Sequence, residues 1–314
     1  MIVTDIHGDW DAYVRYRDRF LELKSAGSAD VLIFTGDMIH SYGPPEQDHS
    51  LEIILDILQL KKSLGDALIT LLGNHEVPHL YSIELRKGNL EFTARFEHAM
   101  GEHRRKILRL FNEMPIYIRT RAGVSICHTG GAATFLKPGG AATIFTLSHE
   151  RIWQEAQTIL PDENLKTARA AFQTRFGLNY DEEVYNLLAI TSPKDRRYDD
   201  LLYGNAISSY HNDFQLLWET LFNKNEHQYR SIRYGLFLDA LLRELGDEYT
   251  PQRYLVTGHI DCPANGHTIV SGKQLRIASG KHAHKQDARK YLLVDMGQPI
   301  ENMRDLVTGL GSVY

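Results

Sequence analysis

The sequence predicts an α/β protein that carries a mainly helical insertion. Three observations predict this class: strand-like apolar runs alternate with helical patterns over residues 1–130, helical patterns dominate residues 132–250, and short strand-like runs return over residues 251–297. A chain of 314 residues is long enough for one large domain with an insertion, or for two small domains.

The first 130 residues alternate between strand and helix. Each expected strand is a short apolar run of the kind found in buried sheets. These runs are Ile2–Thr4, Val31–Thr35, Ala67–Leu72 and a hairpin of Ile116–Thr120 with Val124–Cys127. Helices are expected where apolar residues recur at helical spacing, namely at Trp10–Lys24, His49–Leu64 and Phe92–Phe111.

The rest of the chain changes character twice. Helical patterns cover Ser148–Gln173, Asp181–Ala189, Phe214–Phe222 and Ile232–Leu245. Strands are then expected at Tyr254–Thr257, His267–Val270, Gln274–Ala278 and Tyr291–Val294. We interpret residues 297–314 as a tail.

Composition and charge narrow the function classes. The chain is 43% hydrophobic and 24% charged, as is ordinary for a globular enzyme, and its net charge of −5 argues against general nucleic-acid binding. Its apolar runs are far shorter than the roughly 20 residues of a membrane-spanning helix. The first residues, MIVTDIHGDW, lack the features of a signal peptide. With only two cysteines, no disulfide framework is expected, and we predict a cytoplasmic location.

Five expected strands end in residue types that bind metal ions. The motifs are Asp5-Ile6-His7-Gly8, Gly36-Asp37, Gly73-Asn74-His75-Glu76, His128-Thr129-Gly130-Gly131 and Gly258-His259. Strand ends place side chains along one edge of a sheet, where α/β proteins commonly have their sites. One such motif alone is often only a turn, and one histidine is more often structural. The ordered set of five indicates a metal site.

Two ions suit this set better than one. Asp5 and His7 are expected to bind one ion together, because residues i and i+2 of an extended segment share a face. A second ion can be bound by the side chains that follow the later strands, Asn74, His128 and His259. Asp37 has two carboxylate oxygens with which to bridge the ions, which lie roughly 3.5–4 Å apart in dinuclear hydrolases. Mixed carboxylate and imidazole ligands suit Mn²⁺ as the first choice, with Fe²⁺ or Zn²⁺ as alternatives.

In their order along the chain, the motifs resemble those of the calcineurin-like metallophosphoesterase superfamily. DIHG, GDMIH, GNHE, HTGG and GH carry the resemblance, and GNHE and HTGG are most similar to its phosphoprotein (serine/threonine) phosphatase branch. The segment DLLY at residues 200–203 resembles that branch's DLLW, and residues 231–235 and 273–295 resemble its later segments. The resemblance spans most of residues 1–297, and it is specific at the metal motifs and loose in the insertion.

The resemblance implies a metallophosphoesterase fold, in which two packed mixed β-sheets are flanked by helices. Residues 1–131 and 251–314 would form the catalytic core, and residues 132–250 a mainly helical insertion over the active site. Peripheral helices elsewhere are the alternative for the insertion.

The resemblance also implies roles for the motif residues. The first ion would be bound by Asp5, His7 and Asp37, and the second by Asp37, Asn74, His128 and His259. A hydroxide that bridges the ions would attack phosphorus while His75, as general acid, protonates the leaving oxygen. An imidazole suits that role because its pKa lies near neutrality.

Two departures from the branch concern the substrate. Its phosphatases read GDxVDRG where this chain reads GDMIHSYG, so His40 replaces the Asp that orients the catalytic histidine, and Ser41 replaces the Arg that binds phosphate. We keep His40 among the candidate catalytic residues. Another cation must bind the phosphate, because bidentate Arg contacts match phosphoryl geometry. The candidates are Arg230 and Arg233, ahead of Arg196 and Arg197.

A third departure concerns the metals. Many superfamily members read GHxH, whereas this chain reads GHID and has Asp261 in place of the second histidine. Asp261 is a candidate ligand, although protein phosphatases often leave this position to water. His282 and His284 can also approach the site, and the more ordinary interpretation is a polar loop with solvated histidines.

The leading functional hypothesis is hydrolysis of phosphomonoesters, with phosphoserine or phosphothreonine in proteins as the expected substrate. A phosphodiesterase, or a hydrolase of dinucleoside polyphosphates or nucleotides, on the same ions is the alternative. A non-catalytic scaffold would need broken ligands, yet the six ligand positions and His75 all hold competent residue types. The expected partner is therefore a phosphorylated substrate, and the sequence does not indicate an oligomeric state.

Overall fold

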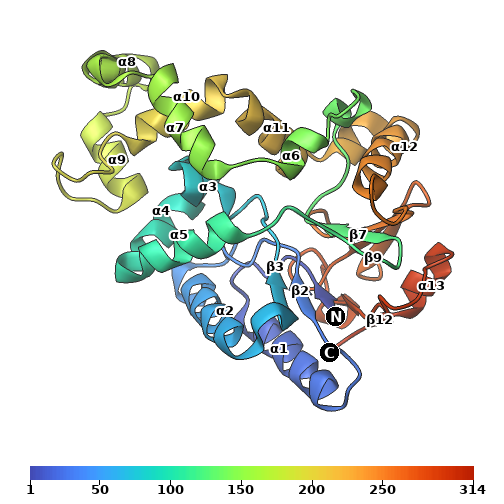
Figure 1. The fold of residues 1–314 in the computed structure, drawn as a ribbon. Helices are drawn as coiled ribbons and strands as arrows, with labels where there is room; N and C mark the ends of the chain where they lie inside the picture. Colours follow the sequence, from blue (N-terminus) through green and yellow to red (C-terminus); the bar gives the residue numbers. More distant parts are fainter. The chain divides into compact units, whose positions relative to one another are not determined.

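The computed structural model describes residues 1–314, except for the side chain of Phe176. The chain forms two compact units, and each is described by itself (Figure 1). Unit 1 comprises Met1–Asn74, Met114–Thr146 and Glu219–Tyr314, and unit 2 comprises His75–Glu113 and Leu147–Trp218. The predicted insertion, residues 132–250, overlaps unit 2 over residues 147–218, and its position over the active site stays a prediction.

The first sheet of unit 1 has five strands in the order β12-β11-β1-β2-β3. Its strands are β1 (Ile2–Val3), β2 (Leu32–Phe34), β3 (Leu68–Thr70), β11 (Tyr291–Leu292) and β12 (Leu310–Gly311). The three strands from the first part of the chain are parallel, whereas β11 and β12 pair antiparallel. The carboxyl ends of β1, β2 and β3 therefore share one edge of this sheet.

The second sheet of unit 1 also has five strands, in the order β6-β7-β8-β10-β9. Its strands are β6 (Tyr117–Arg119), β7 (Val124–Cys127), β8 (Tyr254–Thr257), β9 (His267–Val270) and β10 (Gln274–Ile277). The three central strands are parallel and the two outer strands are antiparallel to their neighbours. The predicted hairpin of β6 and β7 is confirmed.

One apolar core joins the two sheets. Both sheets contribute its buried side chains, which include Ile2, Ile33, Val124, Ile126, Val256, Leu275, Ile277 and Leu292. Polar contacts also join the sheets: the Thr4 amide donates to Ser279 Oγ at 2.9 Å, and the Thr4 hydroxyl donates to the Ile277 carbonyl at 3.0 Å. The predicted fold class, two packed mixed sheets flanked by helices, is confirmed.

Helices flank the sheets of unit 1. They are α1 (Trp10–Ser25), α2 (Ser50–Leu64), α6 (Ala142–Phe145), α12 (Asn225–Gly246) and α13 (Met303–Thr308). In Figure 1, α1 and α2 lie side by side next to β2 and β3. The α1 helix begins after Asp9, whose carboxylate accepts from the Ala12 amide at 3.0 Å, and its buried Tyr13 packs on Phe34 of β2.

Unit 2 is mainly helical. Its helices are α3 (Val77–Tyr81), α4 (Phe92–Met100), α5 (Arg104–Glu113), α7 (His149–Ile159), α8 (Leu165–Phe176), α9 (Tyr180–Leu188) and α10 (Asp200–Tyr210), with α11 (Asn212–Leu221) beginning in it. A short hairpin of β4 (Arg86–Lys87) and β5 (Leu90–Glu91) accompanies them. Part of its core is a cluster that includes Tyr180, Val184 and Leu188 of α9 with Leu201 and Leu202 of α10.

The helical pattern over residues 148–173 forms two helices, α7 and α8, because the chain breaks around Pro161, which has no amide hydrogen to donate within a helix. One expectation about elements was wrong. Residues 297–314 are not a loose tail: α13 buries Leu306 in the core between the sheets, and β12 pairs with β11. Among the described residues, no helix combines the length and apolar character needed to cross a membrane.

Candidate metal centre

All six predicted ligands belong to unit 1, and both sheets contribute to them. Asp5, Asp37 and Asn74 follow β1, β2 and β3 of the first sheet, whereas His128 and His259 follow β7 and β8 of the second. His7 lies two residues beyond Asp5. All six side chains are buried. The parallel strand ends therefore bring together residues that are far apart in the sequence.

The carboxylate of Asp37 lies between two imidazoles. Its Oδ2 is 3.3 Å from Nε2 of His128 and 3.7 Å from Nε2 of His7. Nδ1 of His128 lies 3.0 Å from the Thr35 carbonyl, which only accepts, so Nδ1 carries the hydrogen and Nε2 has a lone pair. The amide oxygen of Asn74 lies 2.9 Å from the same Nε2. Lone pairs thus converge on one point, an arrangement that fits a cation.

His259 completes this group. The ligand atoms of Asp37, His128 and His259 all lie within 4.8 Å of one another. Among the described residues, no hydrogen-bond partner is present for the buried Nε2 of His259. Burial first, and then the neighbouring His128, hold the pKa of His259 well below its usual range, so its imidazole is neutral at pH 7. A neutral, buried imidazole with an unused nitrogen fits a metal ligand.

Asp5 and His7 form a second cluster beside the first. The imidazole Nδ1 of His7 lies 3.3 Å from the Ile39 carbonyl, which leaves Nε2 with the lone pair. Burial lowers the pKa of His7 to about 4, although Asp37 and Asp5 act in the opposite direction. Both oxygens of Asp5 accept from the His259 amide, at 2.9 and 3.0 Å. The residues present therefore fit two neighbouring cations.

The backbone at these ligands is in the left-handed region. Four ligands have positive φ: Asp5 and His7 at 50°, Asp37 at 53° and His259 at 69°. Residues other than glycine rarely adopt this backbone conformation, which costs about 1–3 kcal/mol per residue and is found mostly at functional sites. The expectation that Asp5 and His7 share a face of an extended segment was therefore wrong. Their ligand atoms meet because both residues turn.

Two glycines allow the ligand loops to touch. A Cβ on Gly36, before Asp37, would lie 2.5 Å from the Gly73 nitrogen, before Asn74. A Cβ on Gly258 would lie 1.9 Å from Oδ2 of Asp5. Either methyl group would push the loops apart, so the glycines in GD and GH are required by close approach of the backbone.

The predicted catalytic residues lie in both units. His75 directly follows Asn74 and is the first residue of unit 2, where its buried ring contacts the ring of Phe92 with centroids 5.3 Å apart. His40 is buried in unit 1, has a φ of 72°, and donates its backbone amide to Ser50 Oγ at 2.8 Å.

The predicted phosphate-binding arginines are exposed on α12. Arg230 has non-helical angles, φ 60° and ψ 165°, which divide this helix, and the guanidinium of Arg233 lies 5.2 Å from the centre of the Tyr229 ring. Sequence reasoning did not single out Lys224, just before α12, whose positive charge contributes to the low pKa of His259 after burial, His128 and His282. No sequence motif marks this lysine.

Asp261 belongs to no metal-ligating cluster among the described residues, and its carboxylate contacts two histidines of a later loop. Its Oδ1 lies 2.5 Å from Nδ1 of His282, and its Oδ2 lies 3.4 Å from Nε2 of His284. Burial acts to raise the pKa of Asp261, but these histidines outweigh it and hold the pKa below its usual range.

An open cavity of about 900 Å³ adjoins His7. Its wall includes two aromatic side chains, Trp10 and Tyr42, and two cations, Lys281 and Arg289. The ammonium group of Lys281 lies 3.0 Å from the centre of the Tyr42 ring, and Arg289 donates to Asp9 Oδ2 at 2.8 Å. The cavity therefore leaves open space beside the cluster of Asp5 and His7, with aromatic and cationic side chains in its wall.

Comparisons with known proteins found one family model and several similar solved structures. The family model described as calcineurin-like phosphoesterase matches residues 1–180. The cold-active protein-tyrosine phosphatase of a psychrophilic Shewanella species has a similar structure, with a TM-score of 0.50 at 15% identity, over 93% of this chain and 73% of that chain. A protein serine/threonine phosphatase from Saccharomyces cerevisiae has a TM-score of 0.45 at 13% identity, over 91% and 69%.

At 15% identity the likeness to the Shewanella structure concerns the fold alone. No curated protein matches the chain significantly. The family model covers more than half of the 314 residues. The chain therefore belongs to the calcineurin-like phosphoesterase family and is a hydrolase of phosphoesters that uses divalent metal ions.

Proposed function

We propose that this protein is a phosphomonoesterase of the phosphoprotein (serine/threonine) phosphatase type, with two metal ions bound at the six ligands. One observation carries the proposal: a single carboxylate oxygen of Asp37 lies within 3.7 Å of imidazole nitrogens from both ligand clusters, those of His7 and His128. A carboxylate in this position suits a pair of closely spaced ions.

The chain's own residues prepare the site for these ions. Nδ1 of both His7 and His128 faces a backbone carbonyl, which orients each ring and directs its Nε2 to Asp37. When bound, the ions would supply Lewis-acid activation of the phosphoryl group and of the attacking water. Carboxylate, amide and imidazole ligands favour Mn²⁺, with Fe²⁺ or Zn²⁺ as alternatives.

We propose His75 as the general acid that protonates the leaving oxygen, because it directly follows the ligand Asn74 in the chain. His40 occupies the position of the Asp that orients this histidine in the phosphatase branch. Phosphate binding is assigned to a cation near α12, with Arg230, Arg233 and Lys224 as the candidates. The substrate is a phosphorylated protein or a small phosphoester.

The cavity beside His7 favours a second candidate function. Its volume of about 900 Å³ and its aromatic and cationic wall can accept a diester or a dinucleoside polyphosphate. Such a substrate would stack a base on Trp10 or Tyr42 and place a distal phosphate near Lys281 or Arg289.

A substrate panel tests the two candidates. The chelator-treated full-length protein is loaded with Mn²⁺, and kcat/KM is measured on para-nitrophenyl phosphate, bis-para-nitrophenyl phosphate, a dinucleoside polyphosphate, and peptides with phosphoserine, phosphothreonine or phosphotyrosine. We expect the monoester and the phosphoserine or phosphothreonine peptides to be preferred. A strong preference for the bis ester or the dinucleoside polyphosphate would replace the first candidate by the second.

A further inference from the structure

We propose that His282 is a further protein ligand of the first metal ion, and that Asp261 is its positioning residue. The inference rests on the proposed two-ion site and extends it. In the sequence, the loop of residues 281–284 (KHAH) carries no family motif, and Asp261 stands where many superfamily members have a second histidine. In the structure, Asp261 contacts His282 of this loop.

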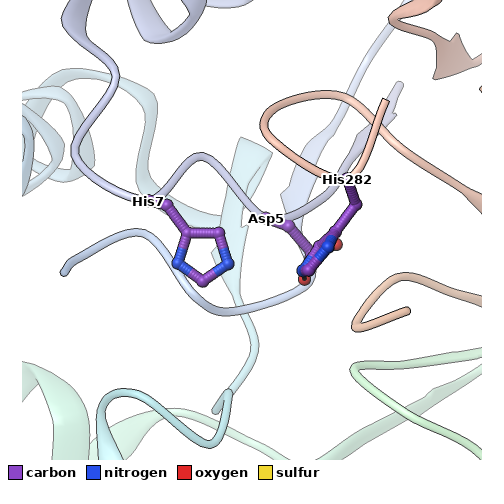
Figure 2. Close-up of side chains that lie close together, drawn as sticks. All are labelled: Asp5, His7 and His282. Carbon is purple, nitrogen blue, oxygen red and sulfur yellow. Dashed lines mark ion pairs between the residues drawn. The ribbon is translucent and has the colours of Figure 1, made fainter. Parts of the chain in front are cut away.

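The imidazole of His282 joins the cluster of Asp5 and His7. The ligand atoms of these three residues all lie within 4.8 Å of one another. Nε2 of His282 is 3.8 Å from Oδ1 of Asp5, and the ring centroids of His7 and His282 are 5.3 Å apart. Figure 2 shows His282 reaching from its loop to Asp5, with the ring of His7 beside them. An ion bound by Asp5 and His7 would therefore have Nε2 of His282 within reach.

Asp261 determines which nitrogen of His282 is available. Its Oδ1 lies 2.5 Å from Nδ1 of His282, and a carboxylate oxygen only accepts, so Nδ1 carries the hydrogen. Nε2, on the side of Asp5, is left with its lone pair. A carboxylate that accepts from one ring nitrogen while the other faces a metal is a common arrangement at histidine ligands. Asp261 thus acts on the site through His282.

The loop that carries His282 is fixed against Asp5 by the backbone. The Cys262 amide donates to the His282 carbonyl at 2.8 Å, and the Ala283 amide donates to the Gly280 carbonyl at 3.1 Å. A Cβ on Gly280 would lie 2.1 Å from the carbonyl oxygen of Asp5, so only glycine permits this approach. The position of His282 is therefore built into the fold.

The neighbouring His284 shows what a solvated histidine looks like in the same loop. Its side chain is 55% exposed, against 10% for His282, and it contacts the other oxygen of Asp261 at 3.4 Å. His284 belongs to no metal-ligating cluster among the described residues. It provides a matched control, because it shares the loop and the carboxylate but not the approach to Asp5.

The test measures metal binding directly. Full-length wild type, His282→Ala and His284→Ala are stripped with a chelator and titrated with Mn²⁺ by calorimetry, and the absorption spectrum of the Co²⁺-loaded forms is recorded. We expect two sites in the wild type. In His282→Ala the affinity of one site falls by at least about tenfold and the Co²⁺ spectrum changes, as for the loss of groups that bind or orient a metal. His284→Ala matches the wild type, and Asp261→Asn has an intermediate affinity.

Each other outcome is decisive as well. Two sites of wild-type affinity and an unchanged Co²⁺ spectrum in His282→Ala would overturn the ligand assignment. A wild type that binds no metal would instead refute the proposed function on which this inference rests. His282→Asn, measured beside His282→Ala with circular dichroism of the metal-free forms, separates loss of a ligand from loss of folding.

Discussion

Oδ2 of Asp37 lies 3.3 Å from Nε2 of His128, although the two residues follow strands of different sheets. The contact is specific to the folded unit 1, because 91 positions separate the two residues in the sequence (128 − 37). It places a carboxylate of the first sheet against an imidazole of the second at the edge where the ligand loops meet. Metal binding and the packing of the two sheets are therefore coupled at this point.

Substitution of Asp37 by Asn is expected to impair both metal sites at once. The amide keeps the size of the side chain but removes the negative charge between His7 and His128. We expect the metal content, measured by mass spectrometry after gel filtration, to fall below two ions per chain, and kcat/KM to fall by at least about 10³-fold. Asp18→Asn, on the exposed face of α1, is the control. Full metal content in Asp37→Asn would refute the bridging role.

Substitution of His75 by Asn is expected to slow the reaction in a way that depends on the leaving group. A general acid contributes typically about 10²–10⁴-fold when the leaving oxygen needs a proton. We expect a loss of this size on phosphoserine peptides and a much smaller loss on para-nitrophenyl phosphate, whose leaving group needs no proton. Both bound ions should remain. Equal losses on the two substrates would contradict the general-acid role.

Removal of the phosphate-binding cation is expected to raise KM and lower kcat without loss of metal. The variants are Arg230→Ala, Arg233→Ala and Lys224→Ala. Loss of a hydrogen bond to a charged group costs about 1.5–3 kcal/mol, which corresponds to roughly ten- to 100-fold in kcat/KM. The positive charge of Lys224 is the smallest of the named causes of the lowered pKa of His259, after burial, and this lysine is included because it directly precedes α12. If none of the three variants changes turnover, the segment around α12 does not bind the phosphate.

Acid is expected to destabilise unit 2 through His149. This histidine of α7 is buried against Tyr81, whose hydroxyl lies 2.6 Å from Nδ1, and burial lowers its pKa from 6.5 to about 4. The folded state favours the neutral imidazole. The contribution of His149 to the free energy of unfolding is therefore fully present above pH 6.5, and it is lost as the pH falls toward 4. This pKa shift corresponds to a loss of roughly 3 kcal/mol in the free energy of unfolding.

Urea unfolding at pH 7.5 and pH 5, followed by tryptophan fluorescence, measures this effect. His149→Gln keeps a hydrogen-bond acceptor for Tyr81 but does not titrate, so the difference in unfolding free energy between the two pH values should shrink. His98→Gln, an exposed histidine of unit 2, should behave as the wild type. An unchanged pH dependence in His149→Gln would show that other groups cause the acid sensitivity.

Much of the centre could be predicted from the sequence because the ligands follow buried strands. The strands before Asp37, Asn74, His128 and His259 are continuous apolar runs, and parallel strands bring their carboxyl ends to one edge. Glycine precedes three of these ligands, and in the structure Gly36 and Gly258 lie against other ligand loops. Local sequence patterns were therefore enough to predict the ligand positions that directly follow a strand.

Long-range contacts without a local pattern could not be predicted. His282 lies in a polar loop, and its approach to Asp5 depends on the turn at Gly280 and on a hydrogen bond with Asp261, 21 positions earlier in the chain (282 − 261). The left-handed backbone angles of Asp5 and His7 could not be predicted from the sequence either, because residues other than glycine rarely adopt them. Strand β12 is two residues long and becomes a strand only by pairing with β11.

The position of β1 between β2 and β11 in the first sheet has a consequence for synthesis on the ribosome. The first strand and its ligands Asp5 and His7 are translated before His259 and the partner strand β11 (Tyr291–Leu292). Protein domains tend to fold as they emerge, from the N-terminus onward. Here four of the six predicted ligands follow strands of a sheet whose β1 edge has no partner until β11 has been translated, so we expect the complete centre to form only after that point.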